Sequence, residues 1–270
     1  MKTLRLPLVF LFGVFAMLIR VEAQTLYGIT GAGQSSSILY QVNSTTGAIV
    51  STIGNTGLVG ITAMRFNPAD GLLYAVTTGD RGVTSNLYRI NTTTAQPTLI
   101  GATGLTGGVP DMAFSSSGTL YAWNENGDSL ITISTTTGGV TPAGISGIDT
   151  YQTGLAFSPG GTLYLKSDSD FYSLNVGASS STFLFTSGQS LSNMLAFNNA
   201  GVAYSGLRTG SATDLFTINM TTGDATLLGR AGAPFSALAF STSAIPEPST
   251  YAAIAGMGVL ALAVYRRRRS

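Results

Sequence analysis

The chain of 270 residues is 44% hydrophobic and only 9% charged, and it holds 34 Gly but neither His nor Cys. The absence of His and Cys excludes Ser-His-Asp and Cys-His triads, disulfides, thiol redox chemistry and the usual zinc and haem ligand sets. The formal charge of +1 hides an uneven distribution: residues 24–248 hold six basic and eleven acidic residues, a balance that excludes the basic footprint of a nucleic-acid-binding protein.

The first 23 residues have the layout of a secretory signal peptide. A basic start precedes an apolar run at residues 6–19, and residues 21–23 place small side chains at positions −3 and −1 of a cleavage site. A retained membrane anchor is the alternative, but the apolar run is shorter than the roughly 20 residues that a spanning helix needs. We therefore expect export through the inner membrane, with cleavage after Ala23 and Gln24 as the mature N-terminus.

Residues 24–243 repeat one pattern of four short strands. The most regular strand of each repeat ends in Phe, at Phe66, Phe114, Phe157, Phe197 and Phe240. Three further runs of β-branched and aromatic residues follow in each repeat, separated by Gly, Asn or Ser-Thr clusters. Four strands per unit at a period of roughly 40–48 residues indicate a β-propeller.

The position of the repeats relative to the chain ends predicts how the ring closes. Complete four-stranded blades are expected over residues 61–101, 112–144, 155–186 and 194–229. Three strands at 26–54 and one inner strand at 236–240 remain, and together they make a fifth blade without exposed inner edges. We therefore predict an all-β, five-bladed propeller clasped by its N- and C-terminal strands. A six-bladed ring is disfavoured because no unassigned span is long enough for another blade.

Two recurring positions in the repeats carry expectations about packing. Ala precedes the terminal Phe of four inner strands, but Arg65 takes this place in the fifth, and its burial would require a charged partner. A Tyr recurs in the second strand of each repeat, at Tyr27, Tyr74, Tyr121, Tyr164 and Tyr204. We interpret these rings as packing between blades rather than as an aromatic binding site.

Two loop segments expected on one face carry closely spaced oxygen ligands. They comprise Asn124, Glu125, Asn126 and Asp128 in one loop and Asp168 and Asp170 in another. Such oxygens suit Ca²⁺, although neither segment matches the EF-hand pattern. The simpler interpretation is an acidic, solvated face without a cofactor, its charge partly compensated by Lys166. We interpret Trp123, beside the first loop, as a cap on its strand; the alternative is an exposed indole that stacks on a sugar ring.

Residues 244–270 form a tail in three parts. Pro246, Glu247 and Pro248 precede an apolar stretch from Tyr251 to Tyr265, and the basic cluster Arg266, Arg267, Arg268 and Arg269 follows. As a helix the apolar stretch would be about 22 Å long, against a hydrocarbon core of about 30 Å. Moving each Arg across the membrane would cost about 2.5–3.5 kcal/mol, so the cluster should stay cytoplasmic. We predict a short transmembrane helix that halts export, with Glu247 held extended and accessible between its prolines.

This tail resembles the PEP-CTERM sorting signal of Gram-negative bacteria, a signature also labelled the ice-binding protein C-terminal domain. The resemblance rests on the PEP motif, the apolar stretch and the Arg cluster, and it covers nothing of the body. It implies that an exosortase, a membrane Cys protease-transpeptidase, cleaves near the motif after transient residence in the inner membrane. The implied final location is the cell surface or the extracellular matrix, and proteins with this signal are typically linked to exopolysaccharide, biofilm or floc production.

Two functions remain open for the body. The first is a non-catalytic propeller that binds extracellular polysaccharide or a surface protein. The second is a metal-dependent hydrolase similar to the regucalcin-like lactonases, which need Glu, Asn and Asp ligands at the channel mouth. The corresponding inner-strand starts here are Thr62, Asp111, Thr153, Asn193 and Ser236. One carboxylate and one amide make a poor metal site, so we favour the non-catalytic function.

Overall fold

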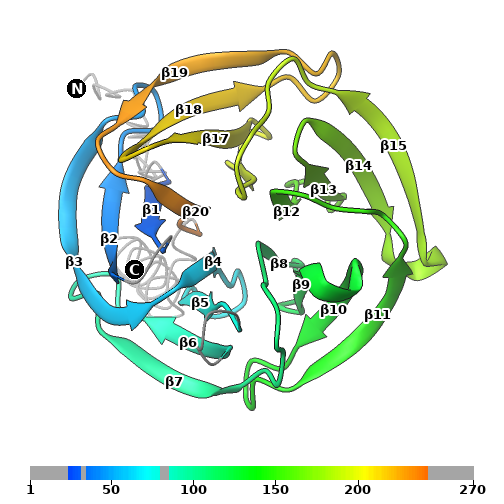
Figure 1. Cartoon of the computed structure of the whole chain (residues 1–270), viewed down its shortest axis with the longest axis horizontal. Coiled ribbons are helices and arrows are strands. Elements are labelled where there is room, and N and C mark those ends of the chain that lie inside the picture. The colour runs from blue at the N-terminus through cyan, green and yellow to red at the C-terminus, as the bar shows by residue number, and fades with distance from the viewer. Residues whose placement is uncertain (1–23, 32–34, 80–84, 243–270) are drawn as a thin grey trace, which may run out of the picture.

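The computed structural model describes residues 24–31, 35–79 and 85–242, in which twenty strands form five four-stranded sheets around a central axis (Figure 1). The prediction of an all-β, five-bladed propeller is thereby confirmed. No helix in the described ranges is long and apolar enough to span a membrane. The predicted signal peptide, the transmembrane stretch Tyr251–Tyr265 and the PEP motif all lie outside the described residues.

Each blade is named here by its strands from the axis outward. Blade 1 consists of β20 (Phe235–Phe240), β1 (Leu26–Thr30), β2 (Ser36–Val42) and β3 (Ile49–Val59). Blade 2 consists of β4 (Ile61–Phe66), β5 (Leu73–Thr77), β6 (Asn86–Ile90) and β7 (Pro97–Ala102). Blade 3 consists of β8 (Met112–Phe114), β9 (Leu120–Asn124), β10 (Ser129–Ile133) and β11 (Val140–Ser146). Blade 4 consists of β12 (Thr153–Phe157), β13 (Leu163–Ser167), β14 (Asp170–Asn175) and β15 (Ser180–Thr186). Blade 5 consists of β16 (Ala196–Phe197), β17 (Ala203–Thr209), β18 (Ala212–Ile218) and β19 (Ala225–Ala231). Two short 3₁₀ turns, η1 (Glu125–Gly127) and η2 (Val176–Ala178), follow β9 and β14.

The ring closes between its first and last strands, as the repeat register predicts. β20 pairs antiparallel with β1, with Leu26 opposite Phe240 and Gly28 opposite Leu238. The backbone N–H of Ser241 donates to Thr25 O over 2.8 Å, and the amide of Gln24 donates to Ser241 O over 2.8 Å. Both ends of the described body are therefore fastened at one point on one face of the ring.

The loops between third and fourth strands show why Asn, Thr and Gly recur there. Asn43 Oδ1 accepts the backbone N–H groups of Thr45 and Thr46, over 2.9 and 3.1 Å. Gly47 closes the turn with a φ of 71°, in the left-handed region that favours glycine. The Asn side chain thus bonds to backbone N–H groups that have no partner in a strand, and the glycine lets the chain turn back into the next strand.

Aromatic pairs pack neighbouring blades together. The pairs are Tyr27–Phe66, Tyr74–Phe114, Tyr121–Phe157, Tyr164–Phe197 and Tyr204–Phe240, with ring centroids 4.9–5.7 Å apart. In each pair the Tyr comes from the second strand of one blade and the Phe from the inner strand of the next. The interpretation of the recurring Tyr as inter-blade packing is confirmed, and each pair contributes about 0.5–1.5 kcal/mol beyond the area it buries.

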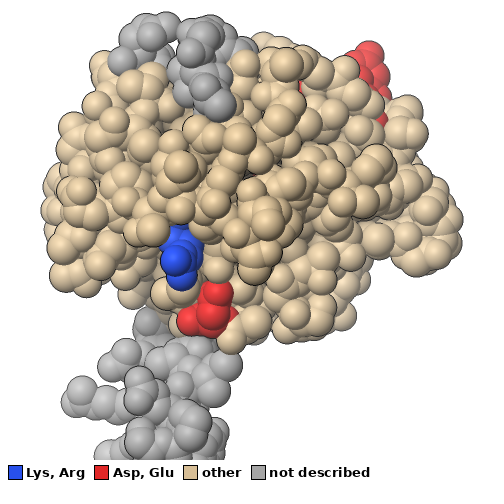
Figure 2. Space-filling model, turned by 90° about the horizontal axis from the view of Figure 1, so that it is seen from below, with Lys and Arg blue, Asp and Glu red and all other residues tan. Residues whose placement is uncertain are grey.

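The outer wall of the ring carries few charged side chains on the side drawn in Figure 2. Large apolar side chains lie exposed on four outer strands, namely Val50 on β3, Leu99 on β7, Phe183 on β15 and Leu227 on β19. The outer strand of each blade therefore contributes less to the core than the three strands inside it.

A substitution in β20, the strand that closes the ring, tests ring closure directly. Phe235 on β20 is wholly buried, and its ring fills the space above Gly28 on β1, where an added Cβ would lie 2.7 Å from the ring. Phe235→Ala should lower the free energy of unfolding by about 3–5 kcal/mol, as expected for a fully buried Phe. The matched control Phe183→Ala, at a side chain 53% exposed, should cost no more than about 1 kcal/mol. Urea unfolding followed by Trp fluorescence measures both; equal costs would show that the clasp does not stabilise the ring.

Candidate functional site

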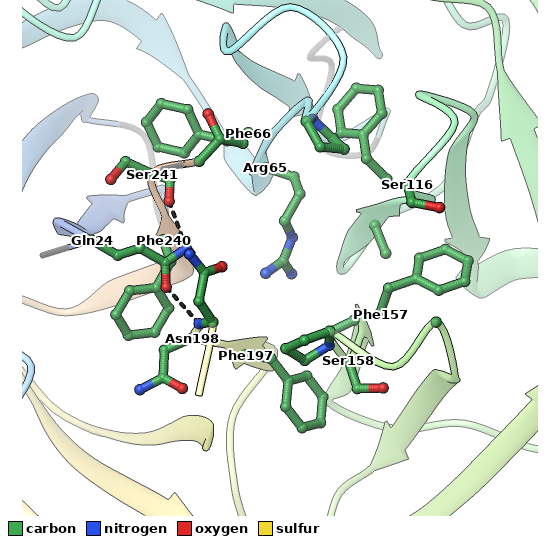
Figure 3. A pocket seen from close by; sticks show the side chains of 18 of the residues that line it. Gln24, Arg65, Phe66, Ser116, Phe157, Ser158, Phe197, Asn198, Phe240 and Ser241 are labelled. Atoms are coloured by element: carbon green, nitrogen blue, oxygen red, sulfur yellow. Dashed lines mark hydrogen bonds between the residues drawn. The ribbon is translucent and has the colours of Figure 1, made fainter. Parts of the chain in front are cut away.

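A hollow of about 490 Å³ opens on the ring axis, at the face where the ends of the described body lie. The Phe residues that end the inner strands line it, namely Phe66, Phe114, Phe157, Phe197 and Phe240. Figure 3 shows the guanidinium of Arg65 in the middle of the hollow. Gln24 and Thr242, the first and last described residues, also line the hollow. The entrance of the channel is thus formed where the chain enters and leaves the ring.

Arg65 on β4 crosses the channel and bonds to three other blades. Its Nε donates to Met112 O over 2.9 Å, and Nη2 donates to Leu155 O over 2.9 Å and to Leu195 O over 2.7 Å. Nη2 also pairs with Asp111 Oδ1 over 3.0 Å, and the Arg65 side chain is only 11% exposed. One side chain therefore connects the inner strands of blades 2 and 3 with the inner segments of blades 4 and 5.

Asp111 accepts hydrogen bonds from the backbone N–H groups of the same three residues whose carbonyl oxygens accept from Arg65. Its Oδ1 accepts the N–H of Met112 over 2.9 Å, and its Oδ2 accepts those of Leu155 and Leu195 over 3.0 and 3.1 Å. Burial raises the pKa of Asp111, and the Arg65 charge and the three amides oppose that rise. The expectation that a buried Arg65 needs a charged partner is confirmed. The carboxylate that sequence analysis assigned to a possible metal ligand set is engaged in this ion pair instead.

Lys166 is a second buried cation, and sequence analysis placed it wrongly on the surface. Its Nζ donates to Gln152 O over 2.7 Å and to Leu191 O over 3.0 Å, with Asp168 O at 3.4 Å, and its exposed fraction is zero. Burial lowers the pKa of Lys166 to about 7, against the opposing effects of Asp168 and Asp111. Alignment of the repeats could have predicted the burial of Lys166, because it occupies the position of Val76 in blade 2, which is also wholly buried.

Trp123 occupies the same register position in blade 3 and is also fully buried. Its Nε1 donates to Thr150 Oγ1 over 2.8 Å, and Thr150 in turn donates to Asp128 Oδ1 over 2.7 Å. The sugar-stacking hypothesis is therefore wrong, because the indole presents no ring face to solvent. Trp123 packs in the apolar core that blades 3 and 4 form together, and its N–H bonds to Thr150, as a buried indole requires.

The predicted calcium ligands lie near the ends of second strands and bond locally. Asn124, Glu125 and Asn126 lie at η1 of blade 3, and Asp128 accepts from Thr150. In blade 4, Asp168 accepts from Ser190 and Asp170 from Thr186. The described residues contain no group of three acidic side chains arranged to hold a metal ion. The calcium site stays a prediction that this geometry does not support.

A comparison with known families decides the nature of the tail. A model of the PEP-CTERM protein-sorting motif matches residues 244–269. The chain carries a PEP-CTERM sorting motif. The match includes Pro246, Glu247, Pro248 and the cluster Arg266–Arg269, as the sequence predicts, and it implies exosortase processing, export and a location at the cell surface. It begins four residues after the end of β20.

Comparisons of the body with solved structures show its fold. The chain is similar to one chain of a nidogen/laminin complex, with 12% identity and a TM-score of 0.55 over 82% of this chain and 99% of that one. It is also similar to TolB from Acinetobacter baumannii, with 18% identity and a TM-score of 0.50 over 77% of this chain and 53% of that one, so it spans about half the TolB chain. A 6-phosphogluconolactonase, named as putative, from Bacteroides fragilis matches with 10% identity and a TM-score of 0.48 over 82% and 99% of the two chains. A search of curated proteins finds no match.

The axial ion pair predicts a large effect from a nearly isosteric change. Asp111→Asn removes the negative charge and leaves Arg65 buried without its counter-ion, which should lower the free energy of unfolding by about 3–5 kcal/mol at pH 7. Asp149→Asn, at an exposed loop position, is the control and should change it by less than about 0.5 kcal/mol. Chemical denaturation compares the two, and a loss at Asp111 no greater than at Asp149 would contradict the assigned network.

Lys166 predicts a distinctive pH dependence of stability. Between pH 7 and 9 the unfolded chain keeps the Lys166 proton, whereas the folded chain, with the pKa lowered to about 7, releases it. The unfolded state then binds more protons, so the Lys166 contribution to stability rises with pH by up to about 1.4 kcal/mol per pH unit. Lys166→Met should remove that rise. Denaturation of both proteins at pH 6–9 gives the difference, and parallel pH profiles would show that Lys166 is charged throughout.

Proposed function

We propose that this protein is an exosortase-sorted propeller of the cell surface or extracellular matrix, which acts as a non-catalytic binding or structural protein linked to exopolysaccharide or biofilm. The observation that carries the proposal is the PEP-CTERM motif at residues 244–269, directly after the strand that closes the ring. The sorting motif therefore follows closely on β20, the strand that must pair with β1 for the body to close.

The placement of the ends supports an orientation for the body during sorting. Eight residues separate Thr242 from the predicted membrane stretch that begins at Tyr251. A fully extended chain of that length spans at most about 30 Å. The face with the hollow would lie near the membrane before cleavage, and the acidic loops at η1 and Asp168 would point away from it. A body released by the exosortase would then expose both faces.

The non-catalytic assignment is supported by what the polar groups at the axis already do. Asp111 is engaged by Arg65 and three amides. Thr62 Oγ1 donates to Val109 O over 2.7 Å, and Ser236 Oγ donates to Ile61 O over 2.7 Å. These are three of the inner-strand positions at which the sequence comparison with lactonase-like propellers looks for metal ligands. Each of the three has a structural partner within the ring.

Glu247→Ala tests the sorting function in the native host. A strain without the gene receives the wild-type chain, Glu247→Ala, or the neighbouring control Ser249→Ala. We expect the wild type and Ser249→Ala to be cleaved and recovered outside the inner membrane, and Glu247→Ala to stay full-length in it. Mass spectrometry of the fractions measures this. Equal processing of Glu247→Ala would refute recognition through the motif.

The same strains test the matrix function and its alternative. Loss of the gene should reduce biofilm mass, and the wild-type chain but not Glu247→Ala should restore it. Unchanged biofilm and polysaccharide in the deletion strain would rule out the matrix role. Turnover of a sugar lactone by the purified full chain in the presence of a divalent cation would support the hydrolase instead.

A further inference from the structure

The hydrogen bonds that Arg65 makes at the ring axis leave one of its nitrogens, Nη1, without an acceptor among the described residues. Nε and Nη2 make all four of its hydrogen bonds, and Nη1 donates to none of the described residues. The buried side-chain atoms without a partner in the described ranges are Ser37 Oγ and Thr153 Oγ1, so Nη1 is not sealed in the protein. Figure 3 shows the guanidinium facing the open middle of the hollow. Two N–H groups are therefore available to an acceptor that enters the channel.

The charge around this donor favours an anion. Neither Asp nor Glu is among the residues that line the hollow, and Arg65 is the charged residue there. Asp111 is 1% exposed and lies behind the guanidinium, where four donors share its charge. The Arg65–Asp111 pair is neutral as a whole, so it attracts anions only weakly from a distance. A ligand inside the hollow nevertheless contacts Nη1 of Arg65 and not the Asp111 carboxylate.

The walls of the hollow suit a compact ring with hydroxyl groups. Partly exposed Phe157 and Phe197 offer aromatic surface, and Ser116 and Ser158 add hydroxyls at the rim. Ser158 Oγ accepts the N–H of Thr162, which leaves its own O–H free to donate. A volume of about 490 Å³ lies within the range of small-molecule sites.

We propose that the channel mouth binds a hydroxylated carboxylate of the sugar-acid class, with its carboxylate on Nη1 of Arg65 and its ring between the Phe side chains. The ligand is either a free sugar acid or the terminal uronate of a polysaccharide, which share this chemistry. The inference deepens the proposed binding function by naming its site and ligand class. It is independent of sorting, so its failure would leave the fractionation result for Glu247→Ala unchanged.

Titration calorimetry on the full chain in detergent tests this site with D-glucuronate and its neutral counterpart D-glucose. We expect saturable binding of glucuronate at one site per chain and at least tenfold weaker binding of glucose. Ser116→Trp would place an indole over the mouth without touching the ion pair, and it should weaken glucuronate binding at least tenfold. Ser117→Trp, at the adjacent exposed position that does not line the hollow, is the matched control and should stay within twofold of wild type.

An oligosaccharide that ends in glucuronate distinguishes the two sources of the ligand. Binding of the free sugar acid with equal affinity indicates a small-molecule ligand, and at least tenfold tighter binding of the oligosaccharide indicates a polymer end. Three results would overturn the proposal: no saturable binding of either glucuronate probe, equal affinity for glucose, or the same effect of both Trp substitutions.

Discussion

Pairing between β20 and β1 is the constraint on which the rest of the molecule depends. Blades 2 to 5 each contain an unbroken run of four strands, but blade 1 takes its inner strand from the other end of the chain. Without β20, three strands would lose the partner at the axis, and their inner edge would be open to other chains. The hydrogen bonds of Gln24, Thr25 and Ser241 extend that pairing to the rim of the channel.

The axial ion pair depends on ring closure in turn. Arg65 reaches acceptors in three other blades, and Asp111 reaches donors at Leu155 and Leu195. These groups converge only when the inner strands stand around a common axis. A buried pair of this kind contributes less to net stability than its Coulomb energy suggests, because both charges lose water. Its role here is to fix the positions of the inner strands, and it leaves Nη1 of Arg65 at the floor of the hollow.

The fold was predictable from the sequence because its signals are local and repeated. The inner strands repeat at a period near 43 residues and each ends in Phe, and a turn that begins with Asn or Ser follows the third strand of every blade. An incomplete unit at each end of the body indicates the clasp. The environments of Lys166 and Trp123 were not predicted, because residue type suggested the surface. Their register positions match buried Val76, so alignment of the second strands would have placed both inside.

The partners of Arg65 lay beyond sequence reasoning for a different reason. Its need for a counter-ion follows from the cost of burying a charge. Which acid supplies it depends on how far each blade is rotated about the axis, and no local pattern records that angle. Recognition of the tail, by contrast, required composition and order alone, because the PEP motif, the apolar stretch and the Arg cluster are contiguous.

Native-state hydrogen exchange, followed residue by residue with increasing denaturant, tests ring closure most directly. If the ring opens only as a whole, the amides of β1 and β20 should exchange with the same free energy of opening as those of β12, in the middle of the chain. Exchange of β1 and β20 at a lower free energy, while β12 stays protected, would show that the ends separate from a ring that persists without them and would contradict the account.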